Sequence, residues 1–344
     1  MTNPVLAEVT RGGLVESFHT GAVIAVDAGG TTRFALGDVD RPIFPRSAYK
    51  PLQTLALVES GAADAFALDA SDIALACASH NGEDLHHDRV EAWLGELGLT
   101  TDALACGIDT PMEPEHKAAF HRAQRTPDRA FHNCSGKHTG MLTLCQHAGH
   151  THDNYQHYEH ASQQHWINLM GEMCGIDAGR CDWDYDGCGL PALAMPLRDL
   201  ARGFARLANP AALTGARADA ATRIHAACTA HPMMVAGSGR ACTRVMETLG
   251  DIALAKTGAE GVFAGSVPSL GLGFALKIDD GARRASEVAL SAVLDALGLL
   301  SDAQRTALAP TLTPDVVNSR GQTVGTLRAP GELVASLRTG GART

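Results

Sequence analysis

Strand-like sequence stands at both ends of this chain of 344 residues, and helix-like sequence fills the middle. Short apolar runs are bounded by Gly, Asp and Pro, which is the pattern of hairpins. These runs are 14–18, 23–26, 32–38, 262–267, 273–278 and 324–328. We therefore expect the two ends of the chain to pair in one mostly antiparallel sheet, with a helix at 285–299 across a face.

The middle of the chain shows the spacing of apolar residues that is typical of amphipathic helices. The expected helices are 51–60, 84–97, 155–175, 191–208 and 217–230, with a short strand at 73–78 and a loop at 131–140 that leads into a helix from Met141. The predicted fold class is α/β (α+β), with the antiparallel sheet interrupted by a helical insertion. We expect one catalytic domain, 1–344, whose sheet subdomain is 1–60 plus 235–344 and whose helical subdomain is 61–234.

Composition excludes several classes of protein. A net charge of −10 gives no positive field to collect phosphates, so neither a nucleic acid nor an anionic membrane is expected as a partner. No apolar stretch is long enough for a transmembrane helix, and the first residues lack the basic and apolar regions of a signal peptide. A cytoplasmic location is expected, with the nine cysteines as reduced thiols.

Lysine is scarce: the 28 basic residues are 23 arginines and five lysines. Arginine supplies permanent charge, whereas a desolvated lysine can act as a neutral base. Lys50, Lys137 and Lys256 lie in motifs rich in Gly, Ser or Cys, and Lys117 and Lys277 do not. The first three are therefore candidates for amine chemistry, and we expect the last two to be ordinary charges.

Three short motifs suggest serine chemistry. They are Ser47-x-x-Lys50, Ser79-x-Asn81 and Lys256-Thr-Gly, in the order found in serine β-lactamases and penicillin-binding proteins. A neutral lysine can take the proton of a nearby serine and create a nucleophile. Pro51 fits best in the first turn of a helix, so Lys50 is expected at the mouth of that helix.

Two cysteines stand in Gly-rich segments, Cys134 before Ser-Gly-Lys and Cys188 within Gly-Cys-Gly. Two thiolates from distant segments can be joined by a zinc ion. The remaining protein ligand is expected from His132, His138 or Lys137, and composition alone favours a histidine. Six histidines between positions 147 and 165 lack the spacing of a metal site, and a solvated face is expected there.

Taken together, the motifs resemble those of the rhizobial-type (class 3, asparaginase II) L-asparaginases, over about residues 5–330. The segments that carry the resemblance are Arg46-Ser-x-x-Lys-Pro-x-Gln53, Cys77-Ala-Ser-His-Asn-Gly-Glu83, His132-Asn-Cys-Ser-Gly-Lys-His-x-Gly-Met141, Asp186-Gly-Cys-Gly-x-Pro191, Gly239-Arg-x-Cys242 and Lys256-x-Gly-Ala-Glu-Gly261. The resemblance implies a fold similar to serine β-lactamases and serine-dependent glutaminases, and a homodimer.

The resemblance also implies roles for individual residues. It implies two Ser–Lys tandems, Ser47 with Lys50 and Ser79 with Lys256, and one zinc ion per chain. The implied zinc ligands are Cys134, Lys137 and Cys188, and the implied pocket residues are Arg46, Asn133, His138, Asp186 and Cys242. The expected activity is hydrolysis of L-asparagine to L-aspartate and ammonia through an acyl-enzyme. A glutaminase or a penicillin-recognising acyl transferase is the alternative, and a non-catalytic zinc protein is a third class.

Overall fold

The computed structural model describes residues 2–340, and the chain divides into two compact units. The sheet unit comprises 1–49, 194–209 and 244–344, and the helical unit comprises 50–193 and 210–243. The sequence places the subdomain boundaries at 60/61 and 234/235, whereas the units meet along the chain at 49/50 and 243/244. The structure also assigns 194–209 to the sheet unit.

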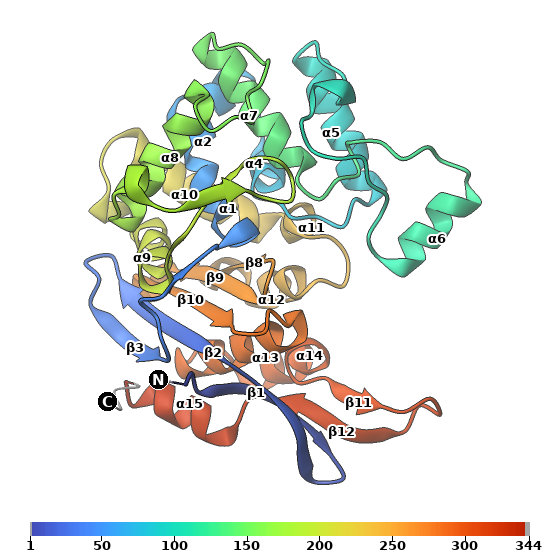
Figure 1. Cartoon of the computed structure of the whole chain (residues 1–344), viewed down its shortest axis with the longest axis vertical. Coiled ribbons are helices and arrows are strands. Elements are labelled where there is room, and N and C mark those ends of the chain that lie inside the picture. Colours follow the sequence, from blue (N-terminus) through green and yellow to red (C-terminus); the bar gives the residue numbers. More distant parts are fainter. Residues whose placement is uncertain (1, 341–344) are drawn as a thin grey trace. The chain divides into compact units, whose positions relative to one another are not determined.

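The sheet unit is built on one antiparallel sheet in the order β11-β12-β1-β2-β10-β9-β8, and β3 also pairs with β2 (Figure 1). Its strands are β1 (Val5–Arg11), β2 (Leu14–Asp27), β3 (Thr32–Leu36), β8 (Leu254–Gly258), β9 (Val262–Val267), β10 (Leu272–Ile278), β11 (Asp315–Val317) and β12 (Thr323–Arg328). The N-terminal strands β1 and β2 therefore lie between C-terminal strands in one sheet, and the predicted fold class is confirmed.

One detail of the strand prediction is wrong. The sequence indicates two strands, at 14–18 and 23–26, with His-Thr-Gly between them, but the structure has a single strand, β2 (Leu14–Asp27). Gly21 lies within this strand rather than in a turn. A Cβ at this position would lie 2.2 Å from the Lys277 carbonyl oxygen, so this glycine allows β10 to approach β2 closely.

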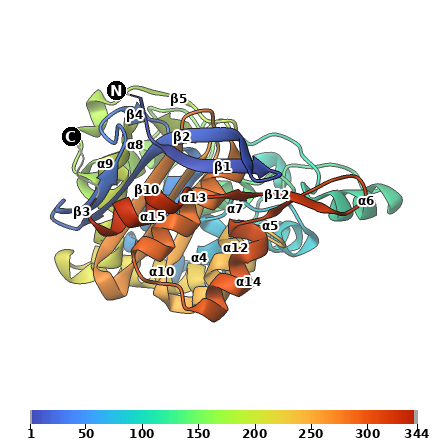
Figure 2. The ribbon, with the colours of Figure 1, turned by 90° about the horizontal axis from the view of Figure 1, so that it is seen from below.

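Helices from two parts of the chain pack on this sheet. They are α9 (Leu197–Ala208), α13 (Arg283–Ala296) and α15 (Gly331–Arg338), and α14 (Asp302–Leu312) packs on α13. The helix α13 packs against β1, β9, β10 and α15. Figure 2 shows α13 from below. A Cβ on Gly273 would lie 2.2 Å from the Ala201 oxygen and from the Ala205 nitrogen, so this glycine allows α9 to lie directly on β10.

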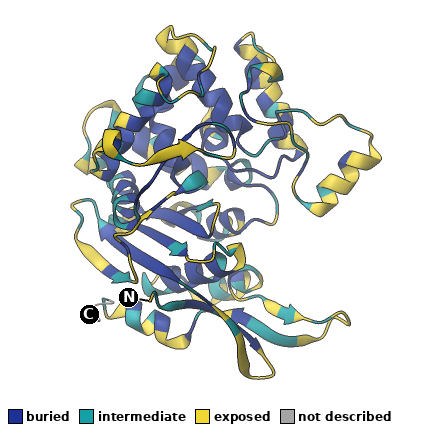
Figure 3. Ribbon diagram, viewed as in Figure 1, coloured by how far each residue is buried: buried dark blue, intermediate teal, exposed yellow. Residues whose placement is uncertain are grey.

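Most of the other helices belong to the helical unit. They are α1 (Lys50–Gln53), α2 (Leu55–Glu59), α3 (Ala62–Ala65), α4 (Ala70–Ala76), α5 (Asp84–Glu96), α6 (Pro114–Arg122), α7 (Ser135–Ala148), α8 (Ala161–Cys174), α10 (Ala216–Ala230) and α11 (Pro232–Val235). Most are buried on at least one face, whereas α6 is largely exposed (Figure 3). A short hairpin, β5 (Trp183–Tyr185) with β6 (Pro191–Leu193), completes the unit. No helix within 2–340 is long and apolar enough to cross a membrane.

The structure corrects three element predictions. Residues 191–196, predicted as the start of a helix over 191–208, form β6 and the short strand β7 (Met195–Pro196), and α9 begins only at Leu197. Residues 73–78, predicted as a strand, belong mainly to α4, which begins after a capping box between Asp69 and Asp72. A short apolar run is compatible with a buried strand or a buried helix, and here the capping residues decide for the helix. The helix predicted from Met141 begins earlier, at Ser135, so Lys137 and His138 are helical rather than in a loop.

Candidate active site and metal site

Ser47 lies in the sheet unit, on a single 3-10 turn, Arg46–Tyr49, that precedes α1. The backbone of Arg46 has φ of 54°, a left-handed conformation that non-glycine residues rarely adopt. Strand β8 packs against this turn, and a Cβ on its Gly258 would lie 2.3 Å from the Pro45 oxygen. The strand that carries Lys256 is therefore held against the turn that carries Ser47, next to a strained residue.

Lys256 is fully buried in β8, and its amine donates a hydrogen bond to the Thr257 carbonyl oxygen at 2.9 Å. Burial of a lysine amine is costly, and a buried lysine can serve as a neutral base. The exposed fraction of Lys277, in the neighbouring strand β10, is intermediate. The two lysines of the sheet therefore differ in burial, as their sequence motifs indicate.

Lys50 is the first residue of α1 in the helical unit, and its side chain is fully buried. Its amine donates to the Ala78 carbonyl oxygen at 2.5 Å, to Ser79 Oγ at 3.2 Å and to Cys134 Sγ at 3.1 Å. The helix mouth predicted from Pro51 is confirmed. Lys50 therefore joins a predicted catalytic serine to a predicted metal ligand, and a neutral Lys50 amine is within reach of the Ser79 proton.

Ser79 is fixed by a buried polar network that the sequence alone did not identify. Its backbone N–H donates to the Val235 oxygen at 3.0 Å, and its carbonyl oxygen accepts from Arg240 at 3.2 Å. Arg240 also donates to Asn81 Oδ1 at 2.9 Å, and Asn81 donates to Glu83 at 2.9 Å.

Glu83 closes this network. It is buried, and one of its carboxylate oxygens accepts both the backbone N–H and the hydroxyl of Ser238, each at 2.7 Å. The hydrogen bonds from Asn81 and Ser238 hold the pKa of Glu83 below its ordinary value, although burial alone would raise it. The ionised Glu83 thus ties the Gly237–Gly239 loop to the segment that carries Ser79.

Cys134 and Cys188 also come together within the helical unit. Cys134 immediately precedes α7, and Cys188 lies in the turn between β5 and β6, where Asp186 N–H donates to the Leu190 oxygen at 2.8 Å. The Lys137 amine, one turn into α7, is 3.1 Å from Cys188 Sγ. All three side chains are buried. The three predicted zinc ligands thus form one buried cluster from two distant segments of the chain.

The charges of this cluster are coupled. The hydrogen bond from the Cys134 thiol holds the pKa of Cys188 well below that of a free thiol, although burial opposes this, and Lys137 lowers it further. Burial disfavours the charged form of Lys137, but Cys188, Cys134 and Asp186 outweigh burial and raise the pKa of its amine.

The donor set of this cluster fits zinc. Sulfur and nitrogen ligands at a tetrahedral angle, with Zn–S about 2.3 Å and Zn–N about 2.0–2.1 Å, lie about 3.5 Å apart. The observed separation of Lys137 Nζ and Cys188 Sγ, 3.1 Å, needs to open by only a few tenths of an ångström. Of the two candidate histidines, His132 accepts the Cys134 N–H at Nδ1 at 3.1 Å, and His138 Nδ1 lies 2.6 Å from the Tyr155 hydroxyl. A histidine ligand, which composition favours, stays a prediction.

The predicted pocket residues are divided between the units. Asn133 lies beside the cluster, since its Oδ1 is 3.0 Å from Cys134 Sγ, and His138 is fully buried, with burial and the charge of Lys137 lowering its pKa to about 3. Asp186 opens the β5–β6 turn, and Cys242 is buried near the start of α12 (Ala241–Leu249). Arg46 belongs to the sheet unit.

The structure therefore brings Lys50, Ser79 and Cys134 together, and it also brings Cys134 together with Lys137 and Cys188, all within the helical unit. Ser47 and Lys256 share the sheet unit. The two predicted tandems, Ser47 with Lys50 and Ser79 with Lys256, each take one member from each unit, and they stay predictions.

Comparison with known proteins identifies the family. The model of the L-asparaginase II family matches residues 7–329. The chain belongs to this family. The resemblance expected from the six motif segments is confirmed, and with it an amidohydrolase of the asparaginase type. No curated protein matches the chain.

Solved structures with related architecture have low sequence identity. A β-lactamase from Mycobacterium bovis is 16% identical over 81% of this chain and 95% of its own, with a TM-score of 0.41. A putative β-lactamase from Bacteroides dorei is 12% identical over 75% and 84%, with a TM-score of 0.41. Mglu in its native form is 17% identical over 87% and 70%, with a TM-score of 0.38.

Proposed function

We propose that this member of the L-asparaginase II family hydrolyses L-asparagine to L-aspartate and ammonia by Ser–Lys acyl transfer. The observation that carries the proposal is the fully buried Lys50 amine, 3.2 Å from Ser79 Oγ. A lysine that supplies only surface charge does not need a buried position, and a buried lysine with only a structural role could be replaced by an apolar residue. A base that must become neutral gains from burial.

In the proposed reaction, Ser47 attacks the side-chain amide carbon of asparagine and Lys50 accepts its proton. Backbone N–H groups at the Ser47 turn stabilise the oxyanion. The hydrogen bond from Lys50 to Ser79 offers a path by which that proton reaches the leaving nitrogen, and Lys256 supports this relay. The C–N bond breaks, ammonia leaves, and water then hydrolyses the aspartyl ester and restores the Ser47 hydroxyl.

Other residues would bind and orient the substrate. Arg46 suits the α-carboxylate of asparagine and Asp186 the α-ammonium, while Asn133, His138 and Cys242 complete the pocket. Cys134, Lys137 and Cys188 would hold one zinc ion. When bound, a zinc ion with two thiolate ligands would order the site rather than supply strong Lewis acidity, because the two thiolates offset its charge. A homodimer also belongs to the proposal.

An ammonia-release assay tests this proposal with asparagine, glutamine and a β-lactam as substrates. Ser47→Ala is expected to abolish asparagine hydrolysis, and activity within tenfold of wild type would contradict the role of Ser47. Preference for glutamine, or turnover of the β-lactam, would favour the alternative acyl transferases. Zinc at one per chain with no turnover of any substrate would favour a non-catalytic zinc protein. Mass spectrometry of the protein after rapid quenching identifies the acylated serine.

A further inference from the structure

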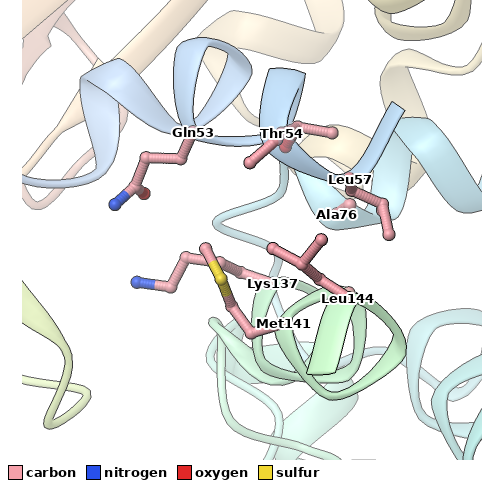
Figure 4. A pocket seen from close by; sticks show the side chains of 9 residues that line it. Gln53, Thr54, Leu57, Ala76, Lys137, Met141 and Leu144 are labelled. Atoms are coloured by element: carbon pink, nitrogen blue, oxygen red, sulfur yellow. The ribbon is translucent and has the colours of Figure 1, made fainter. Parts of the chain in front are cut away.

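A small cavity lies between the α1–α2 segment and α7, within the helical unit (Figure 4). It holds about 10 Å³ of free space, which is close to the least volume that accommodates one water molecule. Most of its wall is apolar, and its polar residues are Gln53, Lys137 and Thr54, whose hydroxyl donates to the Lys50 carbonyl oxygen at 3.0 Å. The residues used below are Gln53, Leu57, Ala76, Lys137, Met141 and Leu144.

Gln53 is the polar residue that needs an explanation. Its side chain is 1% exposed, and neither its amide nitrogen nor its amide oxygen has a hydrogen-bond partner among residues 2–340. Leaving both ends of a buried amide unsatisfied is costly, and native proteins usually resolve such cases with an ordered water molecule. An apolar side chain would fill the same space without this cost.

Lys137 is the second polar residue of the wall. In Figure 4 the Gln53 amide and the Lys137 amine extend from facing helices toward the same side of the cavity. The hydrogen bond from Lys137 to Cys188, at 3.1 Å, uses one N–H of the amine. The others can donate to an acceptor, and the apolar side chains of Leu57, Met141 and Leu144 offer none.

We propose that this cavity is a site for one water molecule, which Gln53 binds through its amide and which in turn positions the Lys137 amine toward Cys188 and Cys134. This inference rests on the proposed metal site. Lysine has a long and flexible side chain, so a metal site that uses it gains from a second contact that fixes the amine. Gln53 is then a positioning residue, because it acts on Lys137 through the water and touches neither the substrate nor the metal.

Zinc affinity tests the proposal without reference to catalysis. The zinc dissociation constants of wild type, Gln53→Met and Gln146→Met are measured by competition with a chromophoric chelator. Gln53→Met is expected to weaken zinc binding about 10- to 100-fold, the usual effect of losing a contact behind a ligand. Gln146→Met makes the same change at an exposed position of α7 and should leave the affinity unchanged. Equal affinity in wild type and Gln53→Met would overturn the proposal.

Cobalt(II) in place of zinc gives a second readout, because its visible spectrum reports the ligand set. Gln53→Met is expected to change the ligand-field bands if Lys137 is no longer held in place, and an unchanged spectrum counts against the proposal. A crystal structure of the wild-type protein covers the case in which the variant does not fold. Water within hydrogen-bond distance of both Gln53 and Lys137 supports the proposal, and an empty cavity overturns it.

The outcomes for the metal and for hydrolysis are separable. A wild-type protein that binds no zinc would overturn the role proposed for Gln53, whatever the ammonia assay shows. A protein that binds zinc with the expected dependence on Gln53, yet releases no ammonia from asparagine, would retain the water site and lose the proposed function.

Discussion

The two units of this chain bury different kinds of residue. Among residues 2–340, the buried charged and histidine side chains of the sheet unit are His19 and Lys256. The helical unit buries a much larger set, which comprises Lys50, Asp72, His80, Glu83, His86, His87, Lys137, His138, His225 and Arg240, and it contains all nine cysteines.

This difference separates residues that determine the fold from those that point to chemistry. Apolar burial stabilises a fold in proportion to area and tolerates exchange between similar side chains. Buried ionisable groups must instead be compensated one by one, through specific partners. Buried ionisable side chains, which lower stability unless they have specific partners, are therefore concentrated in the helical unit. Lys256 is the main example in the sheet unit.

The largest expected effect is on Lys50. Replacing it with Met keeps the volume and removes the amine, so we expect kcat for asparagine to fall by about 100- to 10,000-fold while the protein stays folded. Lys256→Met should cause a loss of similar size, although Lys256 lies in the sheet unit. Ammonia release and circular dichroism on the same samples measure both effects.

Lys117→Arg and Lys277→Arg are the controls for that comparison. Both keep the charge at positions where we assign no amine chemistry, and we expect activity within twofold of wild type, on the order of experimental error. A large loss in either variant would show that the scarcity of lysine has a different origin.

The sheet unit was largely predictable because its signals are local. Alternating strands, hairpin turns and the 285–299 helix all follow from spacing within short windows, and β9, β10, β12 and α13 lie where the sequence indicates. The helical unit was harder, because consecutive apolar residues of α4, from Ile73 to Ala76, are all buried, so that the helical period is lost. Residues 73–78 were mistaken for a strand for this reason.

Within the candidate site, motifs identified the lysines and cysteines but not their supports. Arg240 reaches Asn81 across 159 positions of the sequence, and Ser238 reaches Glu83 across 155. No local pattern encodes such a pairing. The segment around Arg240 was visible as an unusual Gly-Ser-Gly sequence, and its partners became apparent only in the folded chain.

The second largest effect is expected at Arg240. Replacing it with Met leaves the Ser79 carbonyl and Asn81 Oδ1 without their donor, which should lower the free energy of unfolding by about 1–3 kcal/mol. Because the Ser79 backbone then shifts, kcat should also fall, by about 10- to 100-fold. The exposed Arg223, paired with Asp64, is the control, since Arg223→Met should change stability by less than about 1 kcal/mol. Chemical denaturation and ammonia release measure the two quantities.

Glycine substitutions should act in opposite directions in the two units. Gly273→Ala places a Cβ 2.2 Å from the backbone of α9, and we expect it to destabilise the sheet unit by about 1–3 kcal/mol. Gly95→Ala lies on the exposed side of α5 with no atom within 4 Å of the new Cβ, so it should stabilise the helical unit by about 0.5–1 kcal/mol. Thermal unfolding of both variants checks the two signs, and stabilisation by Gly273→Ala would contradict the close packing of α9 on β10.

The smallest expected effect is a pH dependence of stability in the helical unit. Burial alone raises the pKa of Glu59, but hydrogen bonds from His165 and Arg217 outweigh burial and place the pKa below its ordinary value of about 4.3. A carboxyl whose pKa is lower in the folded state stabilises the protein above its unfolded pKa, and this contribution is lost as the pH falls through the folded pKa. Glu59→Gln should therefore cost about 1 kcal/mol at pH 7 and progressively less toward pH 3. The exposed pair of Arg11 with Glu16 in the sheet unit is the control, and Glu16→Gln should show a weaker pH dependence, because solvent screens both partners. Denaturation curves at pH 7 and pH 3 measure the difference, and a gap between wild type and Glu59→Gln that widens at low pH would contradict this account of the buried carboxylate.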